Sequence, residues 1–161
     1  ASLVAIGTEF YYGGDFRTAD SLFTTYSKSF PDSIYGYMWS ARALVQIDTA
    51  MTEGLAVPAY EQILRVAETE KTRELYKNAA IQAAGYLTAY YNNIKEDKAT
   101  ALAYIDRGLA FDPENATLLG YKKALTPRQS AGTQKSSTSS SSAKETKVKT
   151  ENGKTKVKEG K

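Results

Sequence analysis

The sequence predicts an all-helical fold of three helix pairs followed by a C-terminal capping helix. Three observations support this fold class. Apolar residues recur at steps of three and four over long stretches, which places them on one face of a helix. Gly, Pro, Asn and Asp interrupt these stretches where helices would end. A small residue, a larger apolar residue and a proline return with equal spacing in two places: Ala19, Phe23 and Pro31, then Ala101, Ile105 and Pro113.

The first pair is expected over about residues 3–31. Apolar residues from Leu3 to Phe10 hold helical spacing, and Gly13-Gly14 breaks that helix. Asp15 stands where an N-cap belongs, and Pro31 stops the second helix because proline cannot continue the hydrogen-bond ladder. The expected apolar face of this second helix comprises Phe16, Ala19, Leu22, Phe23, Tyr26 and Phe30.

The remaining elements follow by the same criteria. A helix is expected from Ser33 to Ile47, then a loop over 49–54 and a partner helix over 55–69, with Pro58 tolerated in its first turn. The third pair is expected over about 72–93 and 98–111, closed by Pro113. A last helix over 115–124 would cover the open apolar face with one side, formed by Leu118, Leu119, Tyr121 and Leu125.

Composition divides the 161-residue chain at about residue 126. The first 126 residues carry 12 Lys and Arg against 15 Asp and Glu, whereas the last 35 carry 9 against 3. The overall charge of +3 therefore describes an acidic helical domain over 1–126 and a basic tail over 127–161. The tail is rich in Ser and Lys and is expected to be disordered, because it cannot bury enough apolar area. The pattern over 146–158 allows only a weak hairpin, with one Val per strand.

These residues resemble the tetratricopeptide repeat, a 34-residue helix pair in which small residues face large ones and a proline closes the unit. The resemblance is to degenerate repeats of the bacterial type. The matching alanines Ala19, Ala59 and Ala101 are spaced by 40 and 42 residues instead of 34. The resemblance covers about residues 1–113 and implies a right-handed α-α superhelix. The structural repeat positions that it implies are Gly7, Ala19, Phe23, Pro31, Ala59, Ile63, Ala101, Ile105 and Pro113.

The family binds peptides on the concave face of its first helices, so the resemblance implies a non-enzymatic protein-binding scaffold. Tyr suits such a surface because it offers large area at low entropy cost. The alternative is that several of these side chains simply pack between helices. A carboxylate clamp as in chaperone-binding members is not expected, because Val4 and Thr8 occupy its positions. The groove residues implied are Thr8, Tyr11, Tyr12, Tyr35, Met38, Arg42, Tyr86 and Tyr90.

An enzyme is not expected. The chain has no His and no Cys, which removes the commonest general base, the commonest metal ligand and all thiolate chemistry. Acidic pairs occur near Glu68, Glu96 and Asp112, where helix ends explain them as caps. No cofactor, metal or small-molecule substrate is predicted, and Gly13-Gly14 lacks the residues of a phosphate loop.

The alternative function is association with nucleic acid or an anionic surface through the basic tail. The tail has no aromatic residue to stack on bases, which makes nucleic acid the less favoured partner. No apolar run is long enough to span a membrane. The sequence begins without Met, and we expect it to be part of a longer protein.

The compartment stays open in this sequence. An Asp followed by Ser or Thr and an apolar residue occurs at Asp20, Asp32 and Asp48. This triplet resembles an O-glycosylation sequon of exported bacterial proteins, which tilts the expectation toward a bacterial extracytoplasmic location. Helix capping is an alternative explanation for the second and third triplets.

Overall fold

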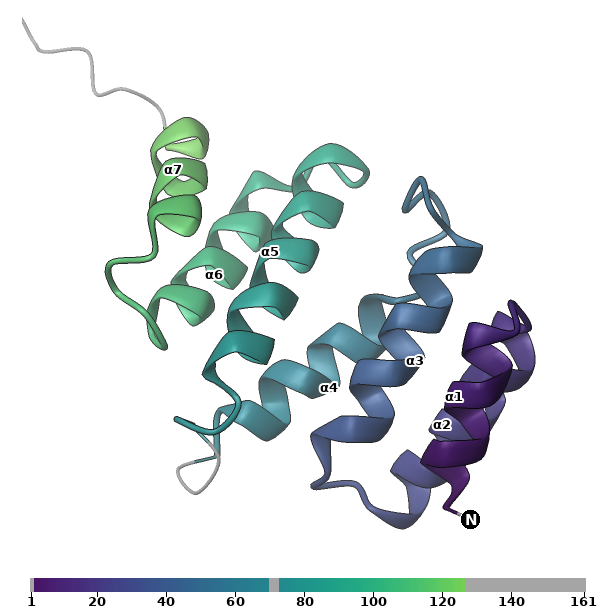
Figure 1. The fold of residues 1–161 in the computed structure, drawn as a ribbon. Coiled ribbons are helices and arrows are strands. Elements are labelled where there is room, and N and C mark those ends of the chain that lie inside the picture. The colour runs from purple at the N-terminus through teal and green to yellow at the C-terminus, as the bar shows by residue number, and fades with distance from the viewer. Residues whose placement is uncertain (1, 70–72, 127–161) are drawn as a thin grey trace, which may run out of the picture. The chain divides into compact units, whose positions relative to one another are not determined.

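The computed structural model describes residues 2–69 and 73–126, which fold into seven α-helices without a strand (Figure 1). Each helix contacts the next one in the chain, and α1 also contacts α3. The described part therefore forms three successive helix pairs and a seventh helix, which confirms the predicted fold class. The helices are α1 (Leu3–Tyr12), α2 (Phe16–Ser29), α3 (Ile34–Ile47), α4 (Val57–Ala67), α5 (Lys77–Asn93), α6 (Lys98–Leu109) and α7 (Ala116–Leu125).

Short polar side chains begin four of these helices. Asp15 accepts a hydrogen bond from the backbone N–H of Thr18 at 3.1 Å, as predicted for α2. Asp97 caps α6 in the same way through Thr100, and Asn115 caps α7. Hydrogen bonds from Thr100 and Thr18 hold the pKa of Asp97 and of Asp15 below the usual value for aspartate. These carboxylates act as helix caps.

Close approach of small residues to large ones organises the core between helices. Ala19, Ala59 and Ala101 are all buried, as the repeat spacing predicts. A Cβ on Gly7 would lie 2.6 Å from the ring of Phe23, and one on Gly108 would lie 2.6 Å from Leu118. Because real Cβ atoms never come so close, these glycines allow α1 to pack on α2 and α6 to pack on α7.

The connection between α3 and α4 explains part of the longer repeat spacing. Asp48 is buried at the end of α3, and its Oδ2 accepts hydrogen bonds from the backbone N–H groups of Glu53, Gly54 and Leu55 at 3.2, 2.8 and 3.3 Å. Burial acts to raise the pKa of Asp48, but these hydrogen bonds outweigh burial and lower it. The carboxylate thus folds the extra residues into a fixed turn, in which Met51 and Gly54 have positive φ angles of 58° and 68°.

The structure corrects three details of the predicted elements. The first helix of the third pair begins at Lys77 rather than near residue 72, and Leu75 lies in the preceding turn with 74% of its surface exposed. Phe30 is exposed just after α2 ends, so it does not belong to the buried face of that helix. On α7 only Leu118 is buried, whereas Leu119 and Tyr121 each expose 44% of their surface. The seventh helix therefore buries fewer of its apolar side chains than predicted.

Two predictions fall outside the described residues. They are the disordered tail over 127–161 and the weak hairpin over 146–158. None of the described helices combines the length and the apolar character needed to cross a lipid bilayer.

Candidate functional site

The first helix of each pair contributes to one surface, which we call the first-helix face. It is defined here by side chains of α1, α3 and α5. On α3 its members lie at helical spacing, because residues three, four and seven apart share one side of a helix. The members are Tyr11, Tyr12, Tyr35, Met38, Trp39, Arg42 and Tyr86.

Trp39 is the centre of an aromatic cluster at one end of this face. Its half-buried ring stacks on Phe23 of α2, with ring centroids 5.7 Å apart and planes 22° apart. Tyr11 and Tyr12 of α1 meet Trp39 edge to face, at centroid distances of 5.4 and 6.2 Å. Such pairs each contribute about 0.5–1.5 kcal/mol beyond area burial. The cluster therefore fixes the indole between α1 and α2.

The Arg42 guanidinium lies over the Trp39 ring, with 4.8 Å between its central carbon and the ring centroid. Arg42 is exposed, and the structure records no ion pair for it within the described ranges. A guanidinium resting on an aromatic face keeps its N–H edges available for a carboxylate. This arrangement provides a positioned cation beside exposed aromatic surface.

A second pair of stacked rings lies further along the same face. Tyr60 of α4 and Tyr86 of α5 stack with centroids 4.2 Å apart, and Tyr60 is buried beneath the face. Side chains of α3, α4 and α5 line a cavity of only about 10 Å³ here, among them Met38, Arg42, Tyr60, Ala79 and Gln82. The face therefore offers protruding side chains here and no deep pocket.

Burial also sets the acid–base behaviour of these phenols. It raises the pKa of Tyr86 to about 12, with Asp48, Tyr60 and Tyr90 adding to the effect. Burial likewise raises the pKa of Tyr60, partly offset by the nearby positive charge of Arg42. Both hydroxyls therefore stay neutral near pH 7.

The predicted groove residues divide by exposure. Tyr12 and Tyr35 expose 78% and 55% of their surface, and Arg42 is also exposed. Tyr11, Met38 and Tyr86 are half-buried. Thr8 is half-buried as well, and its hydroxyl donates to the carbonyl of Ala5 at 2.7 Å. The exposed members surround Trp39 and Met38 on α3.

The prediction of a partner-facing ring is wrong for Tyr90. This residue is only 6% exposed and belongs to the core. Its hydroxyl lies directly against Gly54, where a Cβ would collide with it. The inserted turn after α3 covers the ring, and the sequence alone did not reveal that contact.

Sequence reasoning missed Trp39, although a signal was present. It follows Tyr35 by four residues, so the two share a side of α3, and it is the single Trp of the chain. Its stacking on Phe23 joins residues of different repeats, which no local spacing shows.

The acidic pairs do not form a common centre. Glu68 binds Arg107 at 2.7 Å, Asp97 caps α6, and Asp112 accepts a hydrogen bond from Asn115 at 3.3 Å. No group of three or more potential metal-ligating side chains occurs in the part of the chain that the structure describes. One residue of each pair therefore has a structural partner.

Comparisons with known proteins agree with this architecture. The chain is similar to a solved structure titled as the C-terminal part of a TPR repeat-containing protein from Cytophaga hutchinsonii, with 33% sequence identity and a TM-score of 0.66. The alignment covers 74% of this chain and 45% of that one, so the chain spans less than half of that structure. No family model matches, and no curated protein matches. The described residues thus form a TPR-like array of helical repeats.

Proposed function

We propose that the chain is a non-enzymatic scaffold that binds a peptide or protein partner on the first-helix face. The observation that carries this proposal is the cluster of Tyr12, Trp39 and Arg42, in which an exposed phenol ring, a half-buried indole and a positioned guanidinium lie together. Aromatic residues and Arg are the side chains enriched at the energetic centres of protein interfaces.

The same cluster indicates the chemistry of the partner. Arg42 has an N–H edge to offer a carboxylate, and Tyr12 and Tyr35 offer apolar ring surface nearby with polar tips. The matching segment carries an acidic residue next to an aromatic or aliphatic one. Because Phe23 supports Trp39 from below, the indole is held in place before a partner arrives, which lowers the entropy cost of binding.

The non-enzymatic part of the proposal rests on the available groups. The sequence has no His and no Cys, and burial raises the pKa values of Tyr86 and of Tyr60 beneath the face. The side chains of the first-helix face therefore suit recognition better than proton transfer at neutral pH.

The test uses Trp39 as an intrinsic probe. Peptides are selected from a randomised, end-capped heptapeptide library against the full chain, and their binding is followed by Trp emission and by calorimetry. We expect selected peptides to combine Asp or Glu with an apolar residue and to shift the emission of Trp39, the chain's single Trp.

Two matched pairs of variants locate the site. Tyr12→Ala and Arg42→Ala together are expected to weaken binding at least tenfold by calorimetry, or about 1.4 kcal/mol. Tyr121→Ala and Lys28→Ala remove one exposed Tyr and one exposed cation from α7 and α2 and should leave affinity unchanged. Equal affinities for the two double variants would contradict the assignment to this face.

A further inference from the structure

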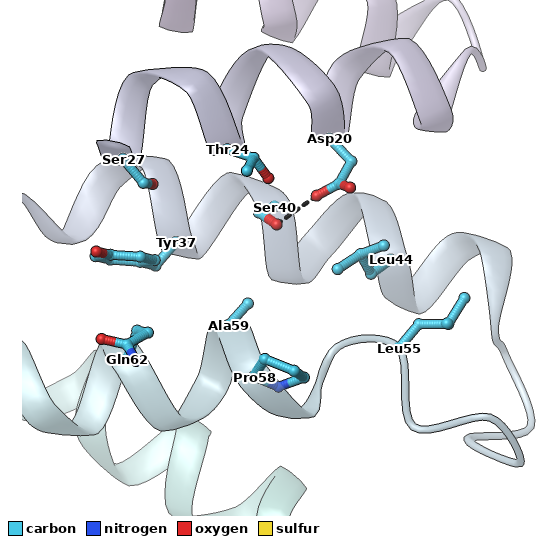
Figure 2. Close-up of a pocket in the computed structure, with 10 residues that line it drawn as sticks. All are labelled: Asp20, Thr24, Ser27, Tyr37, Ser40, Leu44, Leu55, Pro58, Ala59 and Gln62. Atoms are coloured by element: carbon cyan, nitrogen blue, oxygen red, sulfur yellow. Dashed lines mark hydrogen bonds between the residues drawn. The ribbon is translucent and has the colours of Figure 1, made fainter. Parts of the chain in front are cut away.

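The second helices α2 and α4 stand on either side of α3 and leave a hollow between them, which we call the second-helix groove (Figure 2). Its volume is about 380 Å³, within the range of ligand sites in proteins. α3 forms its floor and the other two helices form its walls. The lining residues are Asp20, Thr24, Ser27, Tyr37, Ser40, Leu44, Leu55, Pro58, Ala59 and Gln62.

This groove is distinct from the first-helix face. Ser40 lines the groove, whereas Arg42 belongs to the first-helix face, and residues two apart on a helix point about 200° away from each other. The wall residues Asp20, Thr24 and Ser27 follow one stripe of α2 over seven residues, which is about 10 Å at 1.5 Å per residue. Three residues of an extended chain span about the same length, at 3.3 Å each.

One end of the groove carries a single negative charge. Asp20 is the one charged side chain among the lining residues, and the Ser40 hydroxyl donates a hydrogen bond to its Oδ1 (Figure 2). The structure records no ion pair for Asp20 within residues 2–69 and 73–126. Its second carboxylate oxygen is therefore available to a cation, and the half-buried position reduces screening by water.

The other end carries a hydroxyl without a partner. Ser27 is 6% exposed and lines the groove near Tyr37, and the structure gives its Oγ no hydrogen bond. Buried hydroxyls nearly always have a partner, since an unpaired one loses its bond to water without replacement. Gly36 adjoins this oxygen so closely that a Cβ would overlap it. The contact between Ser27 and Gly36 thus closes this end of the groove, with the hydroxyl oxygen shielded between α2 and α3.

We propose that the second-helix groove binds an extended, lysine-bearing segment of a partner protein. The ammonium pairs with Asp20, and the aliphatic stem lies along Leu44 and Pro58. Lysine fits better than arginine because an ammonium needs only the Asp20 oxygen that accepts no bond from Ser40, whereas a two-bond guanidinium contact would compete with Ser40 at Oδ1. An acidic segment would meet Asp20 with no cation among the lining residues to offset the repulsion.

The test compares four probes on the full chain, labelled with nitrogen-15. The first is an end-capped pentapeptide pool with Lys fixed at the centre, and the second replaces Lys by norleucine, which keeps the stem and removes the charge. The third has Glu at the centre, and the fourth is butylamine alone. We expect only the Lys pool to shift the amide signals of Thr24, Ser27, Ser40 and Leu55.

Two variants place the binding in the groove. Asp20→Asn keeps the shape of the side chain and removes its charge, so affinity for the Lys pool should fall at least tenfold. Glu114→Gln makes the same change in net charge at an exposed position before α7 and should have no effect. Thr24→Phe fills the groove from an exposed position and should block binding while thermal unfolding stays near that of the parent chain.

Each other outcome overturns the proposal. Equal binding of the norleucine pool would show that the charge of Asp20 is not used. Equal binding of butylamine would assign the groove to free amines rather than to a protein segment. Shifts confined to other surfaces, or unchanged affinity in both variants, would remove the groove as the site.

Discussion

The two sides of α3 differ in shape and in charge, although one helix of 14 residues builds both. On one side Tyr35, Trp39 and Arg42 project as rings and a cation over a closed surface. On the other, Tyr37 and Ser40 lie beneath an open groove beside the carboxylate of Asp20. Helical geometry alone separates these sets, because neighbouring positions point about 100° apart. One repeat helix thus presents two surfaces of opposite charge.

The largest expected effect comes from Phe23, which supports Trp39 on the first-helix face. Phe23→Ala removes a fully buried ring that stacks under Trp39 and fills the space beside Gly7. We expect a loss of about 3–5 kcal/mol in the free energy of unfolding, because the cavity does not collapse fully. Chemical denaturation measures it. A loss below about 1 kcal/mol would show that the interhelical packing described here is wrong.

A pair of glycine variants tests how closely α2 packs on α3 at one end of the second-helix groove. Gly36→Ala places a Cβ against Ser27 Oγ and 3.0 Å from the Phe23 carbonyl, so we expect destabilisation of about 1–3 kcal/mol. Gly85→Ala is the matched control within α5, where a Cβ meets nothing within 4 Å. It should stabilise the chain by about 0.5–1 kcal/mol through helix propensity. Effects of the same sign in thermal unfolding would contradict the packing at Gly36.

The smallest expected effects on the free energy of unfolding come from two buried serines at the second-helix groove, Ser27 and Ser40. Ser27→Ala removes the unpartnered hydroxyl, so the free chain should be unchanged or more stable by up to about 1 kcal/mol. Ser40→Ala removes the donor to Asp20 and should cost about 0.5–1.5 kcal/mol. If Ser27→Ala were the more destabilising of the two in denaturant titrations, the hydroxyl of Ser27 would have an internal partner.

Much of this arrangement could be predicted from the sequence, because repeat spacing reports local packing. Ala19, Phe23 and Gly7 were placed correctly because their contact joins the two helices of one repeat. The sequence predicts Leu75 in a helix because it is spaced four residues from Ala79, as on one helix face, whereas the structure has it exposed in a turn. Tyr90 was misjudged because residues inserted far upstream cover it.

The groove could not be predicted for a related reason. It depends on the separation of α2 and α4 across α3, and that separation follows from side chains of three helices rather than from one pattern. Asp20, Ser27 and Ser40 each look like ordinary polar positions of a helix in the sequence. They line one groove only because the fold brings α2 and α3 together.

The most direct test of the scaffold proposal places a photo-crosslinking amino acid at Tyr12 of the first-helix face and, separately, at Tyr121 of α7. Both positions are exposed, so both variants should fold. With a peptide selected on the parent chain, the account predicts a covalent adduct from position 12 and none from position 121. An adduct from position 121 alone would contradict it.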